Sequence, residues 1–257
     1  MIRIFLADLT CIFDEENLHR AFSVSSPQRQ RKAEQYRNLP DQARCIGAGL
    51  LLEQSLWLYK NGESSDGHAL RTQQSDTEEE TKLITVDLQT LLNKANYEEI
   101  PAAQERESSL LLQYEKNGRP FLEGEGHNGS EYGWKSDLKI PYLSISHSGV
   151  YAALALSDRR VGIDIEQTRK IGGSVAKKIL TPEEYIRYEG LQDKAEEARE
   201  YLLEKWTQKE AIAKLDGRGV FALLPALSKE DWLQKEGIKV YTIRPVPGYF
   251  FSVAYKS

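Results

Sequence analysis

The sequence predicts an α+β protein. Helical and strand patterns come in blocks, with helices followed by strands once in residues 1–157 and again in residues 158–257. Such a block order is typical of α+β folds, in which helices pack against antiparallel sheets. The halves share no repeat at the level of single residues. We therefore expect one helix-and-sheet unit in each half.

The N-terminal half begins with a strand and continues with helices. Met1–Leu9 is a predicted strand whose apolar run is too short for a signal peptide. A short helix is expected over Asn17–Val24. A second, basic helix is expected over Pro27–Tyr36, because two serines precede the proline and provide a helix start. Asp41–Lys60 shows the apolar spacing of a long helix.

Two loops are expected before the later strands. Residues 61–81 are polar, contain no aromatic side chain and are predicted to be exposed. Residues 124–139 form a glycine-rich loop. Neither stretch contains a recognisable motif, so neither is expected to contribute to a site.

The remaining elements follow in close succession. Thr181–Glu184 carries a helix start, a threonine cap followed by proline. Pro247–Gly248 provides the turn of a C-terminal hairpin. The expected strands are Tyr142–Ser146, Tyr151–Ser157, Val161–Glu166, Lys239–Arg244 and Tyr249–Tyr255, and the expected helices are Gly173–Ile179, Pro182–Gly190 and Glu196–Leu215.

Composition excludes several classes of function. The chain has 257 residues, of which 40% are hydrophobic, enough for a sizeable core. Its formal net charge of −5 offers no global basic field for nucleic acid. Cys11 and Cys45 indicate neither a disulfide framework nor a zinc cluster and favour a reducing compartment. No apolar stretch approaches about 18 residues, so we expect no membrane span and a cytoplasmic location.

The first chemical motif is Val161–Glu166. Its β-branched residues form one face of the predicted strand, and Asp164 and Glu166 form the other, because side chains alternate along a strand. Two carboxylates at i and i+2 repel each other. Most such pairs are simply solvated on an outer sheet face, so the motif alone does not predict a cation site.

The second motif lies about forty residues later, on the predicted helix Glu196–Leu215. Trp206, Glu210 and Lys214 fall on one side of this helix by its 3.6-residue period. A surface ion pair between Glu210 and Lys214, beside a buried tryptophan, is the simple interpretation. Together, however, the two motifs offer three carboxylates and an ammonium, the groups that a Mg²⁺-dependent reaction at a phosphate requires.

The two motifs resemble those of the 4′-phosphopantetheinyl transferases. Gly162–Glu166 matches the family pattern G-[IV]-D-x-E, and Trp206–Lys214 matches [FW]-[SCT]-x-K-E-[AS]-x-x-K. Both occur in the family's order and within its range of spacing. The chain is similar to the Sfp-like branch, whose members are monomers of two subdomains. It is less similar to the short, trimeric holo-acyl-carrier-protein synthases.

Shorter matches extend the resemblance over most of the chain. Gly118–Pro120 stands where the family has a G-[KR]-P turn, and Leu143–Gly149 resembles the end of a family strand. Ser26–Lys32, together with Arg44–Gly47, resembles the family's N-terminal basic helix. Residues 61–81 look like an insertion relative to the family.

The resemblance implies a fold. It is a pseudo-twofold pair of similar α+β subdomains, each a small antiparallel sheet packed with helices. Residues 1–157 would bind the nucleotide side of coenzyme A, and residues 158–257 would carry the metal and catalytic motifs. The active site is expected in the cleft between the two.

The resemblance also implies a reaction. The enzyme would transfer 4′-phosphopantetheine from coenzyme A to a serine of an apo acyl or peptidyl carrier protein and release 3′,5′-ADP, with Mg²⁺ as cofactor and Mn²⁺ as a substitute. Coenzyme A and a carrier protein are the expected partners. Neither nucleic acid nor a membrane is expected as a partner, and the enzyme is expected to be a monomer.

The catalytic roles of the family map onto the two motifs. Asp164, Glu166 and Glu210 are implied to ligate the metal. Glu210 is also the candidate general base for the acceptor hydroxyl. Lys214 is implied to stabilise the departing 3′,5′-ADP. Lys209 lies about 100° further around the helix and is expected to support the fold or to contact the partner.

Other implied contacts serve the coenzyme. His147 is implied to bind a phosphate oxygen, with Ser146 as a second candidate for the same oxygens. A basic helix is most often a solvated face, so the roles of the cations depend on the positional match. The residues implied to bind the nucleotide and its 3′-phosphate are Arg29, Lys32, Arg44 and Arg119.

Some features leave alternatives open. Cys45 stands where related enzymes often carry a hydroxyl, and Trp206 is expected to pack behind the site. The main alternative function is a catalytically inactive coenzyme A- or carrier-binding protein. A structural domain with accidental motifs is a second alternative, and a hydrolase lacks the required G-x-S-x-G turn. Apolar residues within Ile171–Tyr188 are the expected surface for the carrier protein.

Overall fold

Two units make up the chain in this computed structural model, Met1–Asp158 and Arg159–Ser257. Most of the predicted loop at 61–81 and part of the loop at 124–139 lie outside the residues that the structure describes. The described residues are 1–61, 72–74, 81–95, 112–116, 118–128, 139–169, 173–229 and 231–257.

The first unit contains a five-stranded sheet in the order β2-β3-β1-β7-β6. Adjacent strands pair antiparallel except for β1 and β3, which run parallel. The chain between β1 and β3 passes through helices and can return to the same end of the sheet, as parallel pairing requires. The strands are β1 (Ile2–Asp8), β2 (Thr72–Gln74), β3 (Thr81–Val86), β6 (Tyr142–Ser148) and β7 (Tyr151–Ser157).

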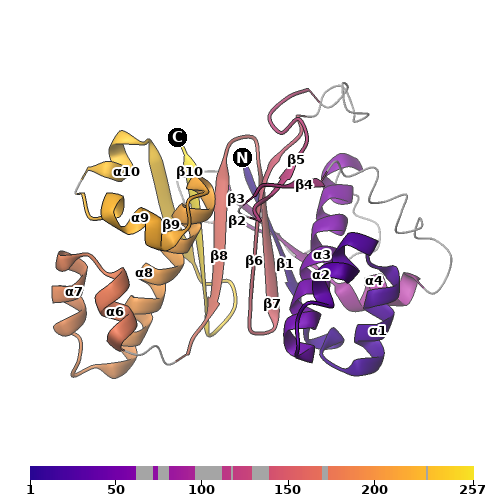
Figure 1. Ribbon diagram of the computed structural model, residues 1–257, viewed down its shortest axis with the longest axis horizontal. Coiled ribbons are helices and arrows are strands. Elements are labelled where there is room, and N and C mark those ends of the chain that lie inside the picture. The colour runs from indigo at the N-terminus through magenta and orange to yellow at the C-terminus, as the bar shows by residue number, and fades with distance from the viewer. Residues whose placement is uncertain are drawn as a thin grey trace. The chain divides into compact units, whose positions relative to one another are not determined.

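Helices of this unit gather on one side of the sheet (Figure 1). The longest, α3, contacts β1, β6 and β7. Ser26 caps α2 by accepting a hydrogen bond from the backbone N–H of Arg29, with Pro27 as the first helical residue, as predicted. The helix ends at Ala33, three residues before the predicted Tyr36. The helices are η1 (Thr10–Ile12), α1 (Glu15–Val24), α2 (Pro27–Ala33), α3 (Leu39–Asn61) and α4 (Leu88–Ala95).

A short hairpin, β4 (Leu112–Tyr114) and β5 (Pro120–Leu122), lies next to β6. Gly118 in its turn has φ 86°, a left-handed conformation that glycine adopts without strain. The backbone N–H of Glu115 donates to the carbonyl of Arg119 across the turn. The predicted Gly-Arg-Pro turn therefore leads into a strand of this hairpin.

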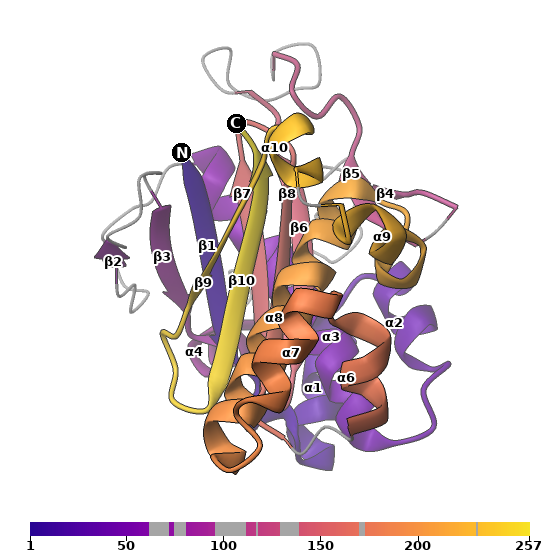
Figure 2. The same ribbon diagram turned by 90° about the vertical axis from the view of Figure 1, so that its left-hand side faces the viewer.

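The second unit has an antiparallel sheet, β8-β10-β9, in which β8 (Val161–Gln167) and β9 (Ile238–Ile243) flank β10 (Tyr249–Lys256). Helix α8 (Ala195–Asp216) lies along this sheet and contacts all three strands (Figure 2). Gly217, at φ 93°, ends α8 in the left-handed conformation. The predicted strands and the long helix are confirmed to within two residues.

Smaller helices surround α8. Thr181 and Glu184 form a reciprocal capping box at the start of α7, where the threonine cap was predicted. The predicted α6 and α7 are confirmed. Helices packed with small sheets make up both units, so the predicted α+β fold class is confirmed as well. These helices are α6 (Gly173–Ile179), α7 (Pro182–Glu189), α9 (Val220–Leu227) and α10 (Trp232–Lys235).

Two further expectations concern the whole chain. No helix among the described residues is both long and apolar enough to cross a membrane. Cys11 and Cys45 are free thiols. Burial, followed by the charges of Asp8 and Asp87, raises the pKa of Cys11 to about 11, so this thiol stays protonated at neutral pH.

Candidate active site

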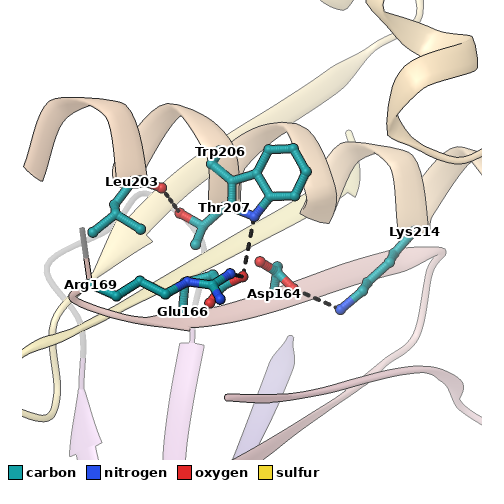
Figure 3. A network of polar contacts seen from close by, with 7 residues as sticks. All are labelled: Asp164, Glu166, Arg169, Leu203, Trp206, Thr207 and Lys214. Carbon is teal, nitrogen blue, oxygen red and sulfur yellow. Dashed lines mark hydrogen bonds and ion pairs between the residues drawn. The ribbon is translucent and has the colours of Figure 1, made fainter. Parts of the chain in front are cut away.

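A glycine on β8 brings the acidic strand face against α8. Gly162 lies on the same face as Asp164 and Glu166, because side chains alternate along the strand. A Cβ atom at Gly162 would stand 2.0 Å from the carbonyl oxygen of Ala211 and 2.7 Å from the backbone nitrogen of Leu215. Only glycine permits this approach, and the approach directs both carboxylates toward the helix (Figure 3).

Asp164 is a buried carboxylate, with 8% of its side chain exposed. Its Oδ1 accepts a hydrogen bond from Lys214 Nζ at 2.8 Å. Lys214 thus reaches from α8 across to the strand. This arrangement excludes the simple interpretation of Asp164 as part of a solvated outer sheet face.

Glu166 is held by two donors. Its Oε1 accepts from the indole Nε1 of Trp206 at 3.2 Å and from Nη2 of Arg169 at 3.3 Å. Trp206 also packs against the apolar clusters around α8, as expected. Its hydrogen bond to Glu166 was not predicted. Because an indole N–H that is removed from water usually has an acceptor, the expected packing of Trp206 could have indicated such a bond.

Glu210 completes an acidic cluster. Its pKa is raised from 4.5 to about 7, first by burial and then by the negative charge of Asp164. Lys214 lowers the pKa and Glu166 adds a further rise. The four residues predicted from the two motifs are therefore electrostatically coupled within one unit, and Glu210 can hold or release a proton near neutral pH.

Lys209 has a different environment on the same helix. It is buried, and its Nζ donates to Glu184 Oε2 at 2.6 Å. The same carboxylate oxygen accepts from the backbone N–H of Thr181 in the capping box. Lys209 therefore ties α8 to the start of α7, which agrees with the expectation that it supports the fold.

The acidic cluster suits a metal ion in its chemistry more than in its arrangement. Among the described residues, no group of three or more His, Cys, Asp or Glu side chains is arranged closely enough to hold an ion. Asp164 and Glu166 are engaged by Lys214 and Trp206 instead. The donor set still fits Mg²⁺ in its chemistry, because all three groups are carboxylates and their mutual repulsion would be relieved by a divalent cation.

The first unit brings Arg29 and Lys32 together on α2. Both contact Tyr114 of β4: Nη2 of Arg29 donates to the tyrosine hydroxyl at 3.3 Å, and Lys32 Nζ lies 5.3 Å from the ring centroid. The predicted cation pair therefore shares one aromatic neighbour, which the sequence analysis did not identify.

Arg44 connects α3 to the β6–β7 turn. Its guanidinium donates to the carboxylate of Asp41 and, at 3.2 Å, to the carbonyl of Gly149. These bonds hold the end of β6 near α3. At that end His147 is exposed, whereas Ser146 is buried.

Arg119 and Cys45 have local environments that the sequence analysis did not foresee. Arg119 forms ion pairs with Glu115 at 3.1 Å and with Glu125 at 3.0 Å, both near its own hairpin. Cys45 is buried in the core of the first unit. A nucleotide contact from Arg119 stays a prediction.

Comparison with known proteins identifies the second unit's motifs. Residues 160–245 match the family model of the 4′-phosphopantetheinyl transferase superfamily, and this range contains the three carboxylates of the acidic cluster and Lys214. Over this range the chain is similar to the superfamily. The predicted resemblance is thereby confirmed.

Curated relatives of the same kind are similar to part of the chain. The chain is 30% identical to the 4′-phosphopantetheinyl transferase psf-1 of Bacillus pumilus over 113 residues, 43% of this chain and 41% of the relative. It is 33% identical to the transferase Sfp of Bacillus subtilis strain 168 over 92 residues, 36% of this chain and 40% of the relative. The transferase gsp of Aneurinibacillus migulanus is 30% identical over 114 residues, 44% and 40% of the two chains. Each match thus spans about two fifths of the superfamily member's length.

Proposed function

We propose that the protein transfers 4′-phosphopantetheine from coenzyme A to a serine of an apo acyl or peptidyl carrier protein, in a Mg²⁺-dependent reaction. The observation that carries this proposal is the acidic cluster of β8 and α8, which lies within the range matched by the superfamily. The match of residues 160–245 to the superfamily and the names of the curated relatives support the same activity.

In the proposed reaction the serine oxygen attacks the β-phosphorus of coenzyme A. A new P–O bond forms to the serine, the bond to the bridging pyrophosphate oxygen breaks, and 3′,5′-ADP leaves with that oxygen. The serine proton would pass to the carboxylate of Glu210, the candidate general base. Lys214 would place positive charge beside the leaving group.

Asp164, Glu166 and Glu210 would hold the metal. When bound, Mg²⁺ would neutralise charge on the pyrophosphate oxygens. Trp206 and Arg169 would keep Glu166 oriented, because both already donate to its Oε1. In the first unit, Arg29, Lys32 and His147 are the proposed contacts of the coenzyme's phosphates and nucleotide, and Arg44 would hold the β6 end that carries the histidine. Arg119 and Ser146 are proposed as secondary contacts.

The proposal is tested by intact-mass spectrometry. The protein is incubated with coenzyme A, Mg²⁺ and a panel of apo carrier domains, and each carrier is examined for the added mass of one phosphopantetheine. Glu210→Gln should abolish the gain. Glu200→Gln, a matched change of an exposed residue on α8 that pairs with Arg244, should not. Coenzyme A binding without transfer to any carrier would favour the binding-only alternative.

A further inference from the structure

Tyr114 is a residue that neither sequence motif contains and that contacts both cations of α2. Its hydroxyl accepts from Arg29 at 3.3 Å, and its ring lies beneath Lys32 at 5.3 Å. A cation over an aromatic face is attracted by the negative face of the ring. One side chain of β4 therefore contacts both cations.

The two cations otherwise repel each other. The pKa of Lys32 is lowered, first by burial and then by the charge of Arg29. Within the described part of the chain, neither Arg29 nor Lys32 forms an ion pair with a carboxylate. Glu53 lines the same pocket as Arg29 but forms no ion pair with either cation, and a phosphate monoester, with nearly two negative charges at pH 7, would match the two cations.

Arg29 is also constrained from the side of α3. A Cβ atom at Gly49 would stand 2.6 Å from Nε of Arg29 and 2.7 Å from its Cγ. The glycine thus leaves space for the arginine stem to lie against the helix. Arg29 borders a pocket together with Ser26, Gln28, Gly49, Leu52, Glu53, Leu112 and Tyr114.

We propose that Tyr114 is a positioning residue that holds Arg29 and Lys32 side by side to bind the 3′-phosphate monoester of coenzyme A. This inference rests on the proposed function, since that function supplies the ligand. Tyr114 acts through the two cations: its hydroxyl orients the guanidinium, and its ring steadies the ammonium. Gly49 serves the same purpose by leaving the arginine its path along α3.

The test compares ligands with and without the phosphate. Calorimetry measures the affinity of the purified protein for coenzyme A, 3′,5′-ADP and 3′-dephospho-coenzyme A. Tyr114→Phe, which keeps the ring, should weaken binding of the first two about threefold, and Tyr114→Leu about tenfold. Binding of 3′-dephospho-coenzyme A should stay unchanged. In the transfer assay the KM for coenzyme A should rise while kcat is retained.

Gly49→Ala provides a variant that leaves Tyr114 unchanged and acts on Arg29 through the added methyl group alone. Alanine in a helix interior favours folding, but here its methyl group displaces the arginine stem. We expect a protein that is at least as stable and that binds 3′,5′-ADP about threefold more weakly. Tyr59→Leu is the control for Tyr114→Leu, because the ring of Tyr59 also lies beneath an arginine, Arg3. Tyr59 is on α3, ten residues after Gly49.

The outcomes distinguish failure of the positioning role of Tyr114 from failure of the proposed transferase function. If wild-type protein binds coenzyme A and Tyr114→Leu keeps the wild-type ratio of affinities for coenzyme A and its dephospho form, the positioning role is wrong and the transferase proposal stands. If wild-type protein binds neither coenzyme A nor 3′,5′-ADP, both are wrong. If circular dichroism shows that Tyr114→Leu is unfolded, the same ratio of affinities is measured for Tyr114→Phe and Gly49→Ala. A wild-type ratio in both variants would show that the positioning role is wrong.

Discussion

Two lysines on α8, five residues apart, form ion pairs that differ in which partner is buried. Lys209 is 5% exposed, and its partner Glu184 is 23% exposed. Lys214 is 29% exposed, and its partner Asp164 is 8% exposed. The first pair joins two helices, and the second joins the helix to β8.

The difference indicates that the first pair stabilises the fold and that the second belongs to the candidate active site. A buried lysine depends on its carboxylate, because an uncompensated buried charge is costly. Asp164, by contrast, lies in a cluster with Glu210 and Glu166, and burial, followed by the charges of Asp164 and Glu166, raises the pKa of Glu210. A cluster of repelling carboxylates opposes folding, so its residues are better candidates for chemistry than for stability. We therefore expect changes at the first pair to affect stability and changes at the second to affect activity.

The largest effect is expected at Asp164. Asp164→Asn removes a proposed metal ligand and should lower the rate of phosphopantetheine transfer about a thousandfold. Stability should change little, since repulsion with Glu210 is relieved while Lys214 retains access to water. Transfer kinetics and urea unfolding measure the two quantities. A rate near that of the wild type would remove Asp164 from the chemistry.

The next effect is expected at Glu184. Glu184→Gln leaves Lys209 buried without its charge partner and should reduce the free energy of unfolding by about 2–3 kcal/mol. The kcat of the folded fraction should be unchanged. Glu183→Gln, at an exposed position in the same turn, is the control. The double variant Lys209→Met with Glu184→Gln should recover most of the loss, and failure to do so would mean that the pair is not the cause.

Glu210 should make stability depend on pH. Its folded pKa of about 7 lies above the ordinary 4.5, so its favourable contribution is complete below about pH 4.5 and is lost as pH rises through 7. Urea unfolding in EDTA at pH 5, 6 and 7.5 should show a decline, on the order of 1 kcal/mol after solvent screening, that is absent in Glu210→Gln. Equal slopes in the two proteins would contradict the shift.

The smallest effect is expected at Trp206, three residues before Lys209 on α8. Trp206→Phe keeps an aromatic ring but removes the donor to Glu166. The Mg²⁺ concentration for half-maximal transfer should rise about threefold, with little change in kcat. Trp232→Phe, on α10, should leave it unchanged. A similar rise in both variants would indicate a general packing effect.

Much of the fold could be predicted because it depends on neighbours in sequence. Alternation along Val161–Glu166 and helical spacing over Glu196–Leu215 identified the strand and helix that carry the acidic cluster. Ser26 and Thr181 each cap a helix through a backbone group three residues away. The parallel pairing of β1 with β3 was missed, because nothing local records the direction in which a distant strand returns.

The candidate site could be predicted only in part. The sequence by itself determined which residue types stand on one strand face and one helix side, since these follow from periods of two and 3.6 residues. Tertiary structure alone decided that Gly162 lets β8 approach α8, that Lys214 pairs with Asp164 fifty residues away, and that Tyr114 joins Arg29. The physical reason is that burial and long-range pairing arise when distant segments pack, and spacing along the chain does not encode them.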